Sequence, residues 1–89
     1  MKVGYAQFAP VFGEKERNIE TILRLLDLGV KQEADLLVLP ELCNTGYVFR
    51  SREEVENLSE EIPEGGTTET LLNFAEKGNV YIVAGLCEK

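Results

Sequence analysis

The spacing of hydrophobic positions changes several times along the chain, and each change predicts a new element. Residues 2–8 form a strand-like pattern, which Pro10 and Gly13 end. Over residues 14–33 the apolar positions recur every three or four residues, the period of a helix with one buried face. The residues on that face are Ile19, Ile22, Leu23, Leu26 and Val30.

The next apolar segment, residues 36–39, is continuous and shows no alternation with polar residues. Such a run is typical of a strand that is buried on both faces in a parallel sheet. Pro40 ends the strand, because proline has no N–H group to donate to the sheet. After a turn at residues 44–46, Ser51 and Glu54 form a capping-box pattern that predicts a short surface helix through residue 59.

The last third of the chain predicts one further helix and one further strand. Thr67 or Thr68 can cap the helix, its buried side would carry Leu71, Leu72 and Ala75, and Gly78 would follow its end. Residues 80–84 then form an apolar strand pattern. The resulting order is β-α-β-α-α-β, which predicts one α/β unit with mostly parallel strands and right-handed crossovers.

Composition and charge narrow the function classes. The 89 residues carry 9 Lys and Arg against 16 Asp and Glu, a formal net charge of -7. Nucleic acid is therefore not an expected partner, because phosphate binding needs a basic face. No apolar run approaches the roughly 18–20 residues of a membrane span, and no secretory signal pattern opens the sequence, so we expect a cytoplasmic protein without a membrane partner.

The chain has two cysteines and no histidine. This composition excludes a disulfide-rich scaffold, a standard zinc site and any Ser–His or Cys–His pair within these residues. We expect Cys43 and Cys87 to be reduced, packed thiols. No metal site and no cofactor is predicted, since Gly65-Gly66 is too short for a phosphate-binding loop.

Glu41 is the candidate for chemistry. Ligands of open α/β sheets bind outside the carboxyl ends of the strands, and Pro40-Glu41 follows the most apolar strand there. Because Leu42 and Cys43 come next, we expect partial desolvation to raise the pKa of the carboxyl toward that of a general base. The alternative is a glutamate that accepts hydrogen bonds from loop amides or pairs with an arginine.

Several segments resemble the nitrilase superfamily, the carbon–nitrogen hydrolases. The main match is Leu39-Pro40-Glu41-Leu42 followed by Thr45-Gly46-Tyr47, which is similar to the first catalytic block of that family. The resemblance also covers the first strand through Gln7, Asn18, the Ile62-Pro63-Glu64-Gly65 loop and the closing Tyr81-Ile82-Val83-Ala84-Gly85 strand. These blocks occur in order over essentially the whole chain.

The resemblance implies a cofactor-free thiol hydrolase that acts on a small amide or nitrile through a Glu-Lys-Cys triad. Glu41 matches the glutamate, the general base, and Tyr47 lies where the family borders its substrate pocket. A tyrosine packed at the sheet edge is the alternative for Tyr47. The implied fold is a four-layer α-β-β-α sandwich, and the family usually forms homo-oligomers.

The triad lysine and cysteine have no counterpart in these residues. Cys43 lies in the loop of Glu41 itself, and the family nucleophile has its own strand-to-turn bend, so we do not assign Cys43 as the nucleophile. We expect residues 1–89 to be the N-terminal segment of an incomplete hydrolase domain. Its sheet face of Leu36, Val38, Val80 and Ile82 would then be uncovered.

Two alternatives remain at this point. The chain could be a catalytically inactive short α/β module for oligomerisation or regulation, or an unrelated α/β binding domain.

Overall fold

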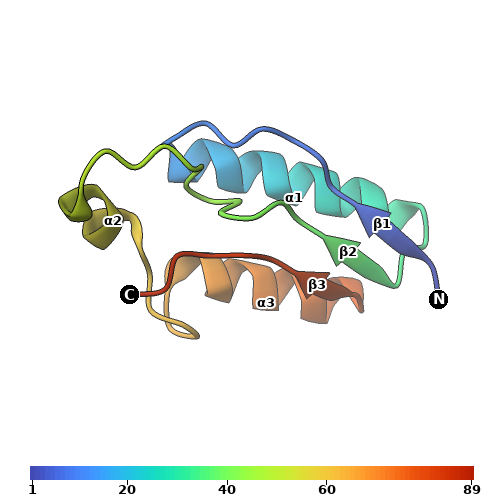
Figure 1. The fold of residues 1–89 in the computed structure, drawn as a ribbon. Coiled ribbons are helices and arrows are strands. Elements are labelled where there is room, and N and C mark those ends of the chain that lie inside the picture. Colours follow the sequence, from blue (N-terminus) through green and yellow to red (C-terminus); the bar gives the residue numbers. More distant parts are fainter.

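Three short parallel strands form the centre of the structure, a computed structural model that describes residues 1–89. The strands β1 (Val3–Tyr5), β2 (Leu36–Val38) and β3 (Tyr81–Val83) lie side by side in the order of the sequence. Each connection between them contains at least one helix, as parallel strands require (Figure 1). The prediction of a parallel α/β unit is confirmed.

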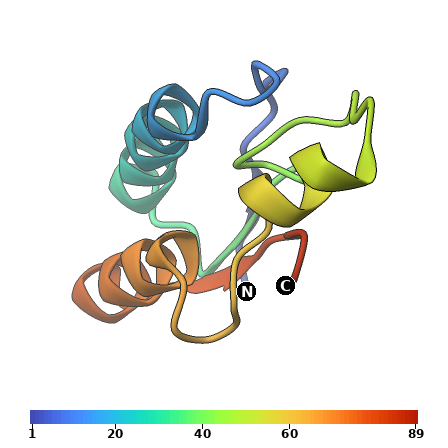
Figure 2. The same cartoon turned by 90° about the vertical axis from the view of Figure 1, so that its left-hand side faces the viewer.

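Two of the three helices cover one face of this sheet. The helices α1 (Lys15–Lys31) and α3 (Gly66–Gly78) lie on the same side of the strands, which is clearest in the view along the sheet in Figure 2. The short helix α2 (Arg52–Leu58) lies beyond the carboxyl ends of the strands (Figure 1). The segment that contains Glu41 leaves β2 at the same end.

The core lies between the sheet and these two helices. Ile22 and Leu26 of α1 are 0% exposed, which confirms the predicted buried stripe. They pack in one cluster with residues of the strands, their extensions and α3, namely Ala6, Leu37, Leu39, Cys43, Leu71 and Val80. In β2 only Leu37 is buried, under the helices, whereas Leu36 and Val38 are half-buried on the opposite face. The expectation that this strand is buried on both faces is therefore wrong for the second face, because both covering helices lie on one side of the sheet.

The ends of some elements differ from the prediction. The outer strands are three residues long, although single main-chain bonds continue past them, such as Ala6 N–H to the Val38 oxygen at 2.9 Å. Helix α3 has Gly65 as its N-cap, so the predicted threonine caps are wrong. Its last residue is Gly78, and Asn79 takes the left-handed conformation with φ +51°. The Thr67 hydroxyl is engaged by Glu60 instead.

The predicted start of α2 is confirmed. The Ser51 side chain accepts a hydrogen bond from the Glu54 N–H at 3.2 Å, which satisfies one of the free donors of the first turn. None of the residues of α2 is buried, as its low apolar content predicted.

The second face of the sheet carries large exposed apolar side chains. Tyr5 is 74% exposed, Tyr81 71%, Val83 51% and Val3 47%. The expectation that Val80 and Ile82 would lie on this face is wrong, since both pack into the core beside α3. The reason is the register, which pairs Leu36 with Tyr81 and Leu37 with Ile82, and alternate residues of a strand face opposite sides.

Candidate active site

The loop after β2 reverses direction through a tight turn. The Leu42 oxygen accepts hydrogen bonds from the Thr45 N–H at 3.2 Å and the Gly46 N–H at 2.8 Å. Leu42 itself has φ +49°, in the left-handed region that costs a non-glycine residue roughly 1–2 kcal/mol. Strained backbone of this kind concentrates at functional sites, where surrounding contacts hold it in place.

The end of the turn docks against the segment that precedes α1. Gly46 has φ +82°, and a Cβ atom there would lie 3.1 Å from the Phe12 Cα. The Thr45 oxygen accepts from the Gly13 N–H at 2.9 Å. Only glycine therefore permits both this backbone conformation and this close approach.

Asn18 joins the same two segments from the interior. Its side chain is buried and forms hydrogen bonds to both the N–H and the carbonyl of Val11, at 2.8 and 2.9 Å. The same Nδ2 also donates to the Asn44 main-chain oxygen at 3.0 Å. Asn18 thus ties the beginning of α1 to the loop that carries Glu41, a contact that its sequence neighbours did not indicate.

The two residues predicted for the site, Glu41 and Tyr47, lie together. The Tyr47 hydroxyl donates to Glu41 Oε2 at 3.0 Å, and this bond to the carboxylate raises the pKa of Tyr47. Both side chains are exposed, so the expected desolvation of Glu41 is absent in this structure. The chain turns toward the core after Leu42, so Cys43 is buried whereas Glu41, which precedes the turn, remains exposed to solvent.

A second carboxylate, Glu60, connects the loop of Glu41 to α1 and α3. The sequence analysis did not single out this residue. Glu60 accepts from the Thr67 N–H and the Thr67 hydroxyl, both at 2.7 Å. It also accepts from Asn44 Nδ2 at 3.0 Å and forms an ion pair with Lys15 Nζ at 2.7 Å. We call these four residues, Lys15, Asn44, Glu60 and Thr67, the Glu60 network.

The environment keeps Glu60 ionised. Burial opposes the charged form, but the ammonium of Lys15 and the hydroxyl and amide of Thr67 outweigh it and lower the pKa of Glu60 from 4.5 to about 2. The sequence offered only indirect signs of this network. It placed Asn44 in a turn and gave Thr67 the role of a helix cap, and nothing in the spacing linked either residue to Glu60.

Cys43 belongs to the same loop as Glu41, but its side chain points into the core. Its side chain is 0% exposed, and desolvation raises the pKa of its thiol from 9.0 to about 11, although hydrogen bonds from backbone N–H groups act in the opposite direction. A thiol of this kind is a poor nucleophile, because the thiolate is the reactive form. The prediction that Cys43 is a packed thiol is confirmed, and its exclusion as the nucleophile is supported.

This difference predicts selective labelling. In the folded protein, iodoacetamide at pH 8 should modify Cys87, which is partly exposed, well before Cys43. A pKa of about 11 instead of 9.0 alone reduces the thiolate of Cys43 by about 100-fold. Mass spectrometry of the peptides over time checks the order, and urea should make the two rates similar. Equal rates in the folded protein would contradict the packing of Cys43.

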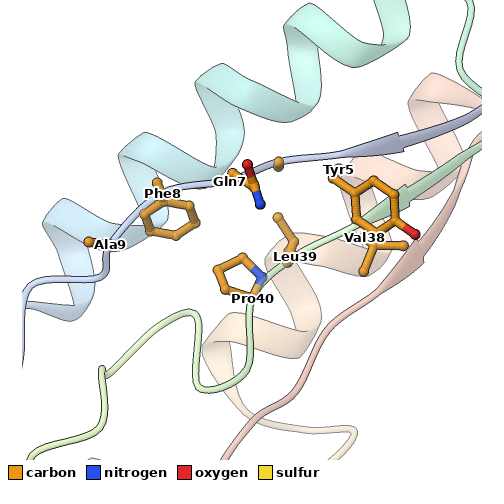
Figure 3. Close-up of a pocket in the computed structure, with 8 residues that line it drawn as sticks. Tyr5, Gln7, Phe8, Ala9, Val38, Leu39 and Pro40 are labelled. Atoms are coloured by element: carbon orange, nitrogen blue, oxygen red, sulfur yellow. The ribbon is translucent and has the colours of Figure 1, made fainter.

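An apolar groove opens beside the site on the uncovered face of the sheet. It has a volume of about 510 Å³ and lies at the carboxyl ends of β1 and β2 (Figure 3). Its lining includes Tyr5, Gln7, Phe8, Val38 and Pro40. Pro40 directly precedes Glu41, so the groove adjoins the candidate catalytic loop.

The structure contains no group of three or more His, Cys, Asp or Glu residues that could hold a metal ion. None of its helices combines the length and the apolar character needed to cross a membrane.

Parallel strands covered by helices, with a carboxylate on the loop after the central strand, define an α/β architecture with a candidate hydrolytic site. Residues 2–89 match the family model described as carbon-nitrogen hydrolase. The chain therefore belongs to the carbon–nitrogen hydrolase family, as its resemblance had implied.

Individual relatives agree with this assignment. The chain is 46% identical over its full length to a nitrilase of Pyrococcus abyssi, and 39% identical over 70% of its length to a protein N-terminal amidase of Schizosaccharomyces pombe. A crystal structure of an N-terminal amidase superposes with a TM-score of 0.80 at 26% identity, over 92% of this chain. The nitrilase-like fold is thus established for these residues.

The chain is short relative to these proteins. It covers 34% of the Pyrococcus nitrilase, 22% of the Schizosaccharomyces amidase and 20% of the amidase chain in the crystal structure.

Proposed function

We propose that residues 1–89 are the N-terminal segment of a carbon–nitrogen hydrolase domain, and that Glu41 is the general base of its reaction. The proposed reaction is hydrolysis of a small amide or nitrile by a Glu-Lys-Cys mechanism. Two relatives whose names are nitrilase and N-terminal amidase support this substrate class.

The observation that carries the proposal is the place of Glu41. It follows the central strand of a parallel sheet, at the carboxyl end where ligands of such sheets bind. It belongs to a strained, firmly anchored turn, and the residue before it, Pro40, lines an apolar groove that is large enough for a small substrate. We propose that Tyr47, which donates to the same carboxylate, borders the substrate.

In the proposed reaction with an amide, Glu41 first takes the proton of the cysteine thiol as the sulfur attacks the carbonyl carbon. The lysine stabilises the negative charge that develops on the oxygen. Glu41 then returns the proton to the leaving nitrogen as the C–N bond breaks. It finally takes a proton from water, whose oxygen attacks the thioester carbon. The carbon–sulfur bond breaks, the carboxylic acid leaves, and Glu41 returns the proton to the sulfur, which restores the thiol and the carboxylate.

The catalytic cysteine of this scheme is neither of the two in the chain. Cys43 is buried with a raised pKa, and Cys87 follows β3, where the family pattern has no catalytic residue. In the same way, none of the five lysines, Lys2, Lys15, Lys31, Lys77 and Lys89, follows a later strand in the manner of the family. Lys15 is also engaged by Glu60.

One observation favours a second candidate, a non-catalytic module that assembles through its sheet. The exposed apolar side chains of Val3, Tyr5, Tyr81 and Val83 form a face suited to association. This candidate predicts an oligomer without hydrolytic activity, whereas the hydrolase predicts turnover that depends on Glu41.

The test is an assay for ammonia release from a panel of small amides and nitriles, using the protein as its gene encodes it. We expect activity on at least one class and its loss in Glu41→Gln. The absence of any turnover, together with a stable oligomer in solution, would favour the second candidate.

A further inference from the structure

Asn44 anchors the loop of Glu41 from two sides. Its side chain is 1% exposed, and Nδ2 donates to Glu60 Oε2 and to Thr67 Oγ1, each at 3.0 Å. Its main-chain oxygen accepts from Asn18 Nδ2 at 3.0 Å. Because the Leu42 oxygen binds the N–H groups of the two residues that follow Asn44, a displacement of Asn44 would also displace the turn next to Glu41.

Stability alone does not explain an asparagine at this position. Its Oδ1 is buried without a hydrogen-bond partner, which costs about 1–3 kcal/mol. Rotating the amide by 180° would not help, since Oδ1 would then face the carboxylate of Glu60. The amide donor is therefore directed at Glu60 at a cost in free energy, which favours a role in fixing geometry.

Glu60 is held independently of the loop. Its N–H donates to the Cys87 oxygen at 3.0 Å, and its own oxygen accepts from the Lys89 N–H at 2.8 Å. The same segment after β3 passes directly behind the site, where a Cβ on Gly85 would lie 3.3 Å from the Glu41 Cα. Glu60 is thus a fixed point against which the loop can be aligned.

We propose that Glu60 and Asn44 are positioning residues, whose hydrogen bond fixes the turn at Leu42–Gly46 and thereby the direction of the Glu41 carboxylate. With respect to the reaction, this inference rests on the proposed function of Glu41. Neither residue lines the apolar groove beside the site, so we expect their effect to be on kcat, through the alignment of the base, and little on KM.

The first variant is Asn44→Asp, which has the same shape but places a carboxylate against Glu60. Above the shared pKa of the pair, repulsion displaces the loop, and we expect kcat per folded molecule to fall at least about tenfold at pH 8. Below that pKa, the new carboxyl at position 44 and the carboxyl of Glu60 share one proton, which takes the place of the amide donor. The kcat of Asn44→Asp, divided by the kcat of the unmodified protein at the same pH, should therefore rise several-fold between pH 8 and about pH 5.5.

Three other charged side chains, all from α1, lie near the pair of position 44 and Glu60. Lys15 of α1 contacts Glu60 directly, and Glu16 and Glu20 of α1 line the same shallow hollow. Asn73→Asp adds the same charge at an exposed position of α3 and is the matched control, for which the kcat ratio should not change with pH.

A second variant tests the pair by exchange. In Asn44→Asp combined with Glu60→Gln, one carboxylate again faces one amide, and kcat per folded molecule at pH 8 should return to within a few-fold of the unmodified protein. If Asn44→Asp alone does not fold, the kcat of this double variant tests the positioning role by itself.

A readout without turnover completes the test. The Tyr47 hydroxyl donates to Glu41, so a displaced loop should lower the pKa of Tyr47 toward its ordinary value of 10.0 in Asn44→Asp. NMR titration of labelled tyrosines measures this pKa, and Tyr47→Phe assigns the signal.

Two results would overturn the inference. One is an unchanged Tyr47 pKa in Asn44→Asp, and the other is a loss of kcat that is reversed neither at low pH nor in the double variant. If the unmodified protein hydrolyses nothing, the proposed function fails, and the Tyr47 titration alone decides on the positioning role.

Discussion

Replacing Glu41 with glutamine is expected to lower kcat by about 10²- to 10⁴-fold, the typical contribution of a positioned acid–base group. Glutamine has nearly the same shape, and its carbonyl oxygen can still accept from the Tyr47 hydroxyl. It cannot take a proton from a thiol or from water. KM should change little, because the proposed role of Glu41 lies in the chemical steps. Steady-state kinetics on the best amide or nitrile measures both constants.

Two controls separate the loss of the base from other effects. Glu56→Gln removes one charge from the exposed surface of α2 and should leave kcat unchanged. Tyr47→Phe removes the hydrogen bond but keeps the carboxylate, and should lower kcat less than Glu41→Gln does. If Glu41→Gln retained more than about a third of the activity while melting normally, Glu41 would not be the general base.

The second large effect is on stability. Glu60→Gln should lower the free energy of unfolding at pH 7 by about 2–4 kcal/mol, because Lys15 loses its partner and an amide donor is brought among the donors of Thr67 and Asn44. The side chain of Glu60 is only 11% exposed, so water cannot replace these bonds. Urea unfolding of both proteins measures the difference.

The pH dependence gives this prediction a second signature. A carboxyl whose pKa is lowered on folding contributes its full stability above its unfolded pKa, near 4.5, and loses it as the pH falls toward about 2. The difference between the unmodified protein and Glu60→Gln should thus be constant above about pH 5 and shrink between pH 4.5 and 2. Glu64→Gln, an exposed control, should show no such difference. A constant difference down to pH 2 would contradict the lowered pKa.

The sequence predicted the elements well where a local pattern determines them. The stripe of α1 follows from its period, and its most buried members, Ile22 and Leu26, are the centre of the core. Helix ends were less predictable, since Thr67 has the chemistry of a cap but a stronger acceptor partner in Glu60. The face of β3 was predicted wrongly, because a shift of one residue in register exchanges the two sides of a strand.

The candidate site was predictable in part. The position of Glu41 directly after a strand follows from the order of residues along the chain, and its partner Tyr47 lies six residues further in the same loop. The Glu60 network could not be predicted in this way. Lys15, Asn44 and Thr67 come from three different parts of the chain, and only the folded structure brings them to one carboxylate.

The one-sided covering of the sheet has a thermodynamic consequence. Only 14 of the 89 residues are buried, and large side chains such as Tyr5 and Tyr81 already contact water in the native state. When residues 1–89 unfold on their own, they therefore expose little additional apolar surface. Their heat-capacity increment per residue should lie below the usual value of about 12–15 cal/mol/K, and their stability should vary unusually little with temperature around its maximum.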